Sequence, residues 1–497
     1  MPMGRPAAVV VLAAGEGTRM RSRLPKVLHS IGGRSLVGHA VRAGRSLDPE
    51  HLAVVVGSGR DLVIDHLSRI DPQARPVVQE DREVAGRYGT GYATRLALEA
   101  LPPLEGSVVV TTGDTPLLTA QTLRALVEAH ESTGHAATVL TAVVPDPEGY
   151  GRILRGPDGA VTAIVEHKDA TPEQREVAEI NSGIFVFDAP ALGDALTRVK
   201  TDNSQGEEYL TDVLGILVED GRSVGAVPAE DWTEILGVNN RVQLAELGRL
   251  LNDRTLRAWM LAGVTVVDPA TTWVDDTVTL APDVTLRPHT QLRGETVVES
   301  GAEIGPETTL TDCRIGAEAT VVRTHGEGAH VGDGASVGPF AYLRPGTRLG
   351  TKGKIGTFVE TKNAEIGAGS KVPHLSYVGD ATLGEHCNIG AGTIFANYDG
   401  VDKHHTDIGD AVFVGSDSVL VAPRTIADGA YVAAGSTVVK DIGPGELGVA
   451  RGTQRNVAGW VERKRPGTRT AQAAKRALDG SGETGVDDAD ASEGTIR

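Results

Sequence analysis

The sequence predicts an α/β domain with a mostly parallel sheet, then a connector helix, then a parallel β-helix. Three observations predict this order. Apolar runs alternate with helical patterns over the first 240 residues, one amphipathic segment follows, and a six-residue repeat begins beyond residue 263. The chain has 497 residues, 40% of them hydrophobic, which is enough for two to four domains with real cores.

The α/β prediction depends on five apolar runs that are typical of buried strands. Segments with helical spacing, such as residues 117–128, lie between them. In a sheet of this kind ligands bind at the carboxyl ends of the strands, where the strand order reverses. The predicted strands are Val9–Leu12, Ala53–Val56, Val108–Thr111, Ala137–Leu140 and Gly183–Phe187.

The connector helix is predicted between Asn240 and Gly263. Leu244, Leu247 and Leu251 recur at helical spacing, and charged residues fill the opposite face. One long amphipathic helix in this position is typical of a link between two domains.

Aliphatic residues on a strict six-residue spacing indicate the parallel β-helix. We expect each to point into a narrow prism, and the small residue beside it to let the chain turn a corner at low steric cost. This use explains 62 glycines in 497 residues, about 12% against a typical ~7%, and only 4% aromatic residues. The residues in phase are Val331, Val337, Leu343, Leu349 and Ile355, then Ile408, Val414, Leu420, Ile426, Val432 and Val438.

The repeat is interrupted once and then ends. Nineteen residues separate Ile389 from Ile408, which leaves room for a projecting loop over residues 397–400. The chain after residue 464 is first basic and then acidic, and low in apolar residues, so we expect a disordered tail. The expected domains are residues 1–240, a linker helix over 241–262, the β-helix over 263–464 and the tail over 465–497.

Charge and cysteine content exclude several classes of protein. The formal net charge of −18 argues against a nucleic-acid polymer as partner. The two cysteines, Cys313 and Cys387, form no zinc-ribbon or disulfide pattern and fit a reducing compartment. No run of about 18 apolar residues occurs, so no membrane partner is expected, and we expect a cytoplasmic protein.

A glycine-rich turn follows the first predicted strand directly. Its backbone N–H groups can cradle phosphates, and Arg19 and Lys26 add positive charge where negative charge develops. The turn has neither the GxGxxG dinucleotide pattern nor the GK[ST] of a Walker A loop.

With Arg19, Met20 and the Pro25-Lys26 pair, the turn resembles that of the sugar-nucleotide pyrophosphorylases. The resemblance extends over nearly the whole chain through GDTPL (113–117), GYGR (149–152), IVEHK (164–168), EINSG (179–183) and GVNN (237–240). Together with the hexapeptide half, the chain is similar to the bacterial family of bifunctional N-acetylglucosamine-1-phosphate uridyltransferases and glucosamine-1-phosphate N-acetyltransferases. The fold implied is an α/β nucleotide-binding (Rossmann-like) domain, a connector helix and a left-handed parallel β-helix of hexapeptide repeats.

The resemblance implies a uridyltransferase site in the first domain. Asp114 and Asn239 match the family's ligands for Mg²⁺, which prefers oxygen ligands, and Arg19 and Lys26 would neutralise phosphate charge. By the family's mechanism, the phosphate of N-acetylglucosamine 1-phosphate attacks the α-phosphorus of UTP and expels pyrophosphate, which requires positioning more than a protein nucleophile. The implied substrate-binding residues are Leu12, Ala13, Ala14, Gly15, Lys26, Gln79, Gly89, Thr90, Thr112, Gly113, Asp114, Gly151, Glu166, Asn181 and Asn239.

One segment departs from the family's pattern. The family has a short connection from Gln to Gly-Thr-Gly-His, whereas here Gln79 and Gly89 are ten residues apart and Tyr92 replaces the His. We interpret residues 80–88 as containing an insertion of about five residues beside the base-reading positions.

The resemblance implies an acetyltransferase site on the β-helix. The amine of glucosamine 1-phosphate is protonated near neutral pH and requires a base, and His374, a residue type with a pKa of about 6.5, suits that role. Arg344 and Lys362 would hold the substrate phosphate, and the absence of a nucleophilic cysteine at the site favours direct attack on the acetyl-CoA thioester. Further matches are Tyr377, Asn388 and Lys403 for the sugar, and Ala391, Asn397, Tyr398, Ser416, Ala434 and Arg451 for acetyl-CoA.

The family's β-helices form homotrimers with acetyl sites at subunit boundaries, which implies a homotrimer here. The implied substrates are small molecules: glucosamine 1-phosphate, N-acetylglucosamine 1-phosphate, UTP and acetyl-CoA. A non-catalytic regulatory subunit with the same two folds is an alternative, disfavoured by the joint presence of Arg19, Lys26, Asp114, Asn239 and His374. A carbonic anhydrase of the γ type requires three zinc histidines at repeat-locked spacing, which the sequence lacks.

Overall fold

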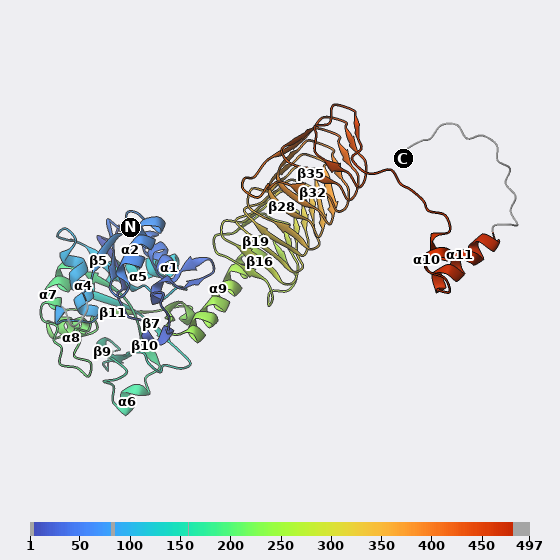
Figure 1. Ribbon diagram of the computed structural model, residues 1–497. Helices are drawn as coiled ribbons and strands as arrows, with labels where there is room; N and C mark the ends of the chain where they lie inside the picture. The colour runs from blue at the N-terminus through green and yellow to red at the C-terminus, as the bar shows by residue number, and fades with distance from the viewer. Residues whose placement is uncertain (1–3, 81–84, 158, 481–497) are drawn as a thin grey trace.

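The computed structural model describes residues 4–80, 85–157 and 159–480 of the chain. Figure 1 shows an α/β domain joined by helix α9 to an elongated solenoid, with two short helices beyond the solenoid. The predicted fold class is confirmed, because a largely parallel sheet is followed by curled sheets of parallel strands that are consistent with a left-handed β-helix.

The central sheet of the first domain has the strand order β11-β7-β10-β6-β1-β4-β5. Strand β1 (Ala8–Ala13) lies inside it and pairs in parallel with β4 (His51–Val56) and β6 (Ser107–Thr112). The five predicted strands are confirmed, because each lies within a strand of this sheet. The remaining strands of the domain are β2 (Ser30–Ile31), β3 (Arg34–Ser35), β5 (Arg75–Val78), β7 (Ala137–Val143), β8 (Arg152–Arg155), β9 (Val161–Val165), β10 (Glu179–Asp188) and β11 (Val224–Pro228).

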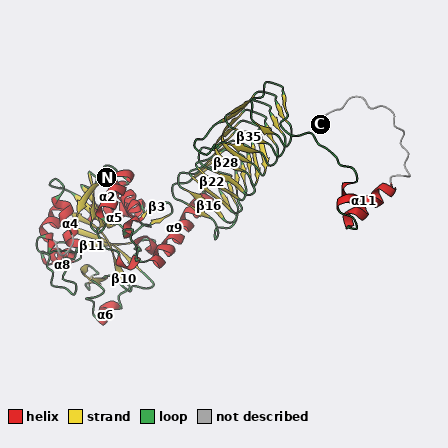
Figure 2. Cartoon of the chain, viewed as in Figure 1, coloured by secondary structure: helices red, strands yellow, loops and turns green. Residues whose placement is uncertain are grey.

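Helices cover both faces of this sheet because its strands are apolar on both sides. On β1, Val9 and Val11 pack with α1, α2 and α5, whereas Ala8 and Val10 pack with α4, α7 and α8. Figure 2 shows these helices around the strands. The helices of the domain are α1 Leu36–Arg45, α2 Arg60–Ile70, α4 Thr90–Glu99, α5 Ala120–Thr133, the short α6 Pro172–Arg175, α7 Ala189–Leu196 and α8 Asp212–Glu219, with short 3₁₀ turns at Thr18–Met20, Lys26–Leu28 and Trp232–Ile235.

The strand order reverses beside β1. From β1 the chain continues to β4 and β5 on one side of the sheet, and it then returns to β6 on the other side. The pair Leu12–Thr112 is in register, and the Gly113 N–H donates a hydrogen bond to the Leu12 carbonyl at 2.8 Å. The glycine-rich turn after β1 therefore lies beside Asp114 after β6, at a position where sheets of this type bind ligands.

Helix α9 (Arg241–Leu261) joins the two parts of the chain. The Asn240 side chain caps its N-terminus by accepting hydrogen bonds from the backbone N–H groups of the first turn. Leu247 and Leu251 are buried against the α/β domain. Near the other end, the Asn252 amide bonds the Thr272 carbonyl and the Val274 N–H at 2.9 and 3.0 Å, which attaches the helix to the first coil of the solenoid.

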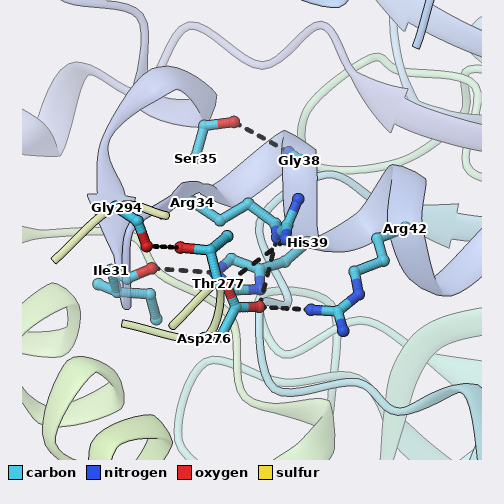
Figure 3. A network of polar contacts seen from close by, with 9 residues as sticks. All are labelled: Ile31, Arg34, Ser35, Gly38, His39, Arg42, Asp276, Thr277 and Gly294. Atoms are coloured by element: carbon cyan, nitrogen blue, oxygen red, sulfur yellow. Dashed lines mark hydrogen bonds and ion pairs between the residues drawn. The ribbon is translucent and has the colours of Figure 1, made fainter. Parts of the chain in front are cut away.

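A second contact between the domains centres on the carboxylate of Asp276, shown in Figure 3. Arg34 and Arg42 of the first domain reach this carboxylate at 3.3 and 2.5 Å, and its side chain is only 12% exposed. The Asp276 N–H also donates to the Gly32 carbonyl at 3.0 Å. The solenoid is thus fixed to the β2–β3 hairpin, which follows the segment that contains Lys26 in the chain.

The solenoid strands pair one coil apart, with Val331 beside Leu349 and Val337 beside Ile355, 18 residues further along. Every predicted repeat residue is buried in one continuous core, so the inward-facing period is confirmed. The solenoid strands extend from β12 (Thr265–Val266) to β39 (Leu447–Gly448). Those used below are β25 Ala341–Leu343, β28 Glu360–Ile366, β29 Lys371–His374, β30 Tyr377–Leu383, β31 Asn388–Ile389, β34 Phe413–Val414 and β37 Tyr431–Val432.

The glycines beside the inward residues serve two purposes. Gly305 and Gly338, with φ of 100° and 99°, turn corners as predicted, whereas others serve the close stacking of coils. Gly332 and Gly350 do not have positive φ, but a Cβ on either would lie 2.7 Å from the backbone nitrogen of the next coil. Several positive-φ corners carry larger residues instead, among them Phe340 and Lys352. The predicted corner-turning role is therefore wrong for Gly332 and Gly350, where backbones that stack coil on coil leave no space for a Cβ.

The expected disorder from Arg465 onward differs from the structure up to residue 480. Helices α10 (Trp460–Lys464) and α11 (Arg469–Gly480) lie beyond the solenoid, and none of their residues is buried. Residues 469–480 contain four alanines, which favour helix and explain the difference. The remainder of the expected tail, residues 481–497, lies outside the described residues. Among the helices of the described ranges, none combines the length and the apolar character needed to cross a bilayer.

Substitution of an inward residue should destabilise the solenoid selectively. Leu420 is fully buried, so Leu420→Ala should lower the free energy of unfolding by about 2–5 kcal/mol through lost contacts and a cavity. Urea unfolding followed by circular dichroism measures this effect. Val439, with 52% exposure, provides the control Val439→Ala, which should change the midpoint little; equal effects of the two variants would contradict the prism interior.

Candidate functional sites

The first candidate site is a pocket of about 220 Å³ at the carboxyl ends of β1 and β6. The strand ends supply Leu12 and Thr112, and Lys26 reaches in from the turn that follows. Ten of the residues named from the sequence line this pocket together: Leu12, Ala13, Ala14, Gly15, Lys26, Gln79, Gly89, Thr90, Thr112 and Asp114. Gly113 lies beside Leu12, because its backbone N–H donates a hydrogen bond to the Leu12 carbonyl.

Gln79 and Gly89 line the same pocket although ten residues of sequence separate them. Gln79 directly follows β5, and Gly89 precedes the first turn of α4. The insertion therefore leaves both predicted base-reading positions at one pocket; its residues 81–84 lie outside the described part of the chain.

Two cations at this site are already paired with oxygen groups. Lys26 Nζ lies 2.5 Å from Asp114 Oδ2, with both side chains largely buried, and Arg19 donates to Asn239 Oδ1 at 2.8 Å. The Val238 N–H donates to the Asp114 carbonyl at 2.9 Å, so the segment with Asn239 lies beside Asp114. A carboxylate and an amide oxygen from two adjoining segments are donors that suit Mg²⁺, with phosphates and water completing its shell.

Gly151, Glu166 and Asn181 come together beside this pocket. The Asn181 N–H donates to the Gly151 carbonyl at 2.9 Å, and a Cβ on Gly151 would lie 3.5 Å from the Glu166 carboxylate. Burial raises the pKa of Glu166, although a hydrogen bond from Thr211 at 3.3 Å opposes the shift. Small residues and polar groups that face one another provide space and hydrogen-bonding groups for a sugar.

Sequence reasoning missed several residues of the first site. Tyr88 and Glu207 line the pocket beside Gly89, and Val27 and Ala93 also contribute to its wall. The position of Tyr88, directly before the Gly89-Thr90 pair, was the available signal. Burial raises the pKa of Tyr150, and its side chain bonds the Gly237 backbone close to Asp114. This contact connects the segment that contains Gly151 to the segment that contains Asn239.

The second candidate site is a cluster on neighbouring solenoid coils. Arg344 follows β25 and pairs with Glu360 of β28 at 3.0 Å, and Glu360 is in register with Tyr377 of β30. The Asn397 amide lies 3.4 Å from the Tyr377 hydroxyl. The register of the coils therefore brings together three of the predicted residues from separate parts of the chain: Arg344, Tyr377 and Asn397.

Lys362 and Lys403 lie side by side in the same cluster, and the proximity of Lys403 lowers the pKa of Lys362. Asp380, which sequence reasoning missed, balances this positive charge. Burial raises the pKa of Asp380, but hydrogen bonds from Asn363 and Asn397 and the charges of the two lysines outweigh it and lower the pKa. Two adjacent lysines with a nearby arginine suit a phosphate ligand.

The loop predicted over residues 397–400 projects from the coil, with residues 398–400 exposed. Tyr398 and Lys403 form a short antiparallel bridge, and the Tyr398 side chain is 59% exposed. His404 pairs with Asp399 at 2.7 Å and closes the loop. Tyr398 is thereby presented at the surface, next to Asn397.

A groove of about 600 Å³ lies further along the solenoid. Ser416, Ala434 and Arg451 line it, and Arg451 donates to the Ala434 carbonyl at 2.9 Å. Ala391 lies beside it, since its carbonyl accepts from the Asp417 N–H at 2.8 Å. The groove also contains residues that sequence reasoning missed, the stacked rings of Phe413 and Tyr431, 5.4 Å apart, with Leu447 and Val449.

His374 ends β29, and the next strand of its sheet, β31, begins with Asn388. The His374 side chain is exposed and its carbonyl accepts from Ser376 at 2.7 Å. Within the described residues of one chain, no hydrogen bond or ion pair joins the His374 ring to the Arg344 cluster or to the groove. The same described ranges hold no group of three or more His, Cys, Asp or Glu suited to a metal, as a zinc site of the carbonic anhydrase type would require.

Comparison with known proteins covers both sites. Residues 9–266 match the family described as "MobA-like NTP transferase domain". The chain is 63% identical over 473 residues to the "Bifunctional protein GlmU" of Streptomyces avermitilis. This match covers 95% of this chain and 97% of the relative. It is 59% identical to the protein of that name from Kineococcus radiotolerans, over 96% of each chain, and 54% identical to that of Corynebacterium glutamicum, over 95% of this chain and 97% of the relative.

The buried Glu166 should make stability depend on pH. The pKa of Glu166 in the folded protein is raised above the ordinary 4.5. Its contribution to the free energy of unfolding is therefore fully present below its pKa in the unfolded chain, and it is lost as the pH rises through its pKa in the folded protein. From about pH 4 to neutral pH, wild-type stability should therefore fall relative to Glu166→Gln.

Urea unfolding at several pH values measures this difference. Substitution of an exposed glutamate in the same domain, Glu128→Gln, is the matched control. A difference between wild type and Glu166→Gln that stays constant across the range would contradict the prediction.

Proposed function

The chain belongs to the family of bifunctional GlmU proteins, and from that membership we propose how its two sites divide the work. The chain is an enzyme with two activities, an acetyltransferase and a uridyltransferase. It acetylates glucosamine 1-phosphate from acetyl-CoA and then transfers the uridylyl group of UTP to N-acetylglucosamine 1-phosphate, with release of pyrophosphate. The observation that carries this conclusion is the full-length match, which includes the pocket of the first domain and the clusters of the solenoid.

The pocket at β1 and β6 is the proposed uridyltransferase site. Gln79, Gly89 and Thr90, which line the pocket, would contact the uracil. Gly151, Glu166 and Asn181, which lie together, would contact the sugar. An oxygen of the sugar phosphate attacks the α-phosphorus of UTP, and the bond from that phosphorus to the bridging oxygen of pyrophosphate breaks. Lys26 and Arg19 would neutralise the charge that develops, and the strand ends hold the reactants in line.

Asp114 and Asn239 would hold Mg²⁺ at this site. When bound, the ion would neutralise phosphate charge and orient the phosphate oxygens. Lys26 and Arg19 occupy these two oxygen groups in the structure, so both side chains would turn from protein oxygens toward the phosphates when substrate arrives.

The solenoid carries the proposed acetyltransferase site. Arg344, Lys362 and Lys403 would bind the phosphate of glucosamine 1-phosphate, with Tyr377 and Asn388 contacting the sugar. His374 would take a proton from the amine, whose lone pair then attacks the thioester carbon and expels CoA as its thiol. Acetyl-CoA would lie along the groove lined by Ser416, Ala434 and Arg451, with Ala391, Asn397 and Tyr398 near the acetyl group.

The acetyltransferase site would be completed by a neighbouring subunit in a homotrimer. The exposed His374 ring makes no polar contact with the Arg344 cluster or the groove within the described part of one chain, which supports a site shared between subunits. We also place the enzyme in the cytoplasm, because both cysteines are buried as free thiols and suit a reducing compartment.

Single substitutions should separate the two activities. His374→Ala should lower acetyl transfer by about 10²–10⁴-fold through loss of the base, with pyrophosphate release from UTP nearly unchanged. Asp114→Ala should do the reverse, with acetyl transfer retained.

The assay contains glucosamine 1-phosphate, acetyl-CoA, UTP and Mg²⁺, with products identified by mass. N-acetylglucosamine 1-phosphate supplied directly should rescue product formation by His374→Ala but not by Asp114→Ala. Loss of both activities in either well-folded variant would contradict separate sites.

The oligomeric state is a further test. Sedimentation equilibrium should give about three times the 51.9 kDa mass of one chain under assay conditions. A monomer with full acetyltransferase activity would contradict a site shared between subunits.

A further inference from the structure

A buried carboxylate lies beside the segment where the sequence departs from its family. The Glu208 side chain is 2% exposed and contacts two arginines. Arg87 Nε is 2.5 Å from one carboxylate oxygen, and Arg95 Nη2 is 3.3 Å from the other. Arg87 lies in the segment interpreted as an insertion, whereas Glu208 is 121 residues further along the chain.

Tyr92, which replaces the family's His, packs against both arginines. The guanidinium carbons of Arg87 and Arg95 lie 5.9 and 5.2 Å from the centre of its ring. An aromatic face next to two cations stabilises them in a partly desolvated position. The substituted residue and the inserted segment therefore belong to one cluster, the Glu208 clamp, which consists of Arg87, Tyr92, Arg95 and Glu208.

The backbone of Glu208 supports one wall of the pocket at β1 and β6, the proposed uridyltransferase site. Its N–H donates to the Tyr88 carbonyl, and its carbonyl accepts from the Gly91 N–H, both at 2.8 Å. Gly89 has φ of 119°, and a Cβ there would lie 2.4 Å from the Glu208 carbonyl oxygen, so only glycine fits between them. The wall from Tyr88 to Thr90 is thus held by the residue that the two arginines fix in place.

We propose that Glu208 is a positioning residue for UTP, which through Arg87 and Arg95 holds the Tyr88–Thr90 wall against the uracil. The proposal rests on the uridyltransferase function of this pocket. The inserted segment is attached at its two ends, by the Arg60–Glu80 pair at 2.7 Å and by Arg87 on Glu208. The clamp compensates for the longer connection, because it fixes the pocket wall directly at the point where the insertion ends.

The test compares Glu208→Gln with Arg87→Gln in the full-length enzyme. We expect Glu208→Gln to raise the KM for UTP about tenfold, with kcat, the KM for N-acetylglucosamine 1-phosphate and acetyl transfer within about twofold of wild type. Arg87→Gln should raise the KM for UTP less, since Arg95 remains, and it serves as the test if Glu208→Gln does not fold. Arg87→Lys, which keeps the charge, should lie nearer to wild type than Arg87→Gln.

Arg198→Gln is the matched control, since it removes an arginine that pairs with Asp194 and Asp220 away from the pocket. It should leave every kinetic constant unchanged. An unchanged KM for UTP in both clamp variants would overturn the proposal, and so would equal rises in the KM of both substrates, which indicate a merely structural role. Failure of the uridyltransferase assignment is distinguishable, because wild type itself would then form no UDP-sugar from UTP.

Discussion

Parallel strands joined by backbone hydrogen bonds are the constraint on which both halves of this protein depend. In the first domain, the pairing of β1 with β6 sets Leu12 beside Thr112 and places the glycine-rich turn next to Asp114. In the solenoid, pairing at one coil's distance sets Glu360 beside Tyr377 and brings Arg344 into the same cluster. Each site is thus assembled from residues that lie far apart in sequence but share a register.

At the two candidate sites of this strongly acidic chain, the cations proposed to bind phosphate are paired with oxygen groups of the protein. Lys26 is held by Asp114, Arg19 by Asn239, and Arg344 by Glu360. In the proposed mechanism, these partners would position the side chains before the ligand binds, and a phosphate would replace them because it bears more charge than a single carboxylate. The net charge of −18 therefore describes the whole surface and not the sites.

The sequence was a good guide wherever a local pattern carried the information. Alternating apolar runs identified the strands, and the six-residue period identified every inward-facing residue that was named. The reason offered for the glycines was wrong at Gly332 and Gly350, because close stacking of coils is a contact between distant residues and leaves no local pattern. Asp380 was missed for the same cause, since its importance comes from the lysines that the coil register places around it.

The sequence by itself determined the strands of the first domain and the six-residue repeat of the solenoid. It also determined the order of the motifs and the chemical character of the residues at both sites. Only the tertiary structure decided whether Gln79 and Gly89 still face one pocket across a longer connection. It also showed that Glu208, rather than a neighbour in sequence, holds the end of that connection. The physical reason is that periodicity reports which side of a strand or helix is buried, whereas the position of a loop is set by long-range contacts and ion pairs that have no spacing to detect.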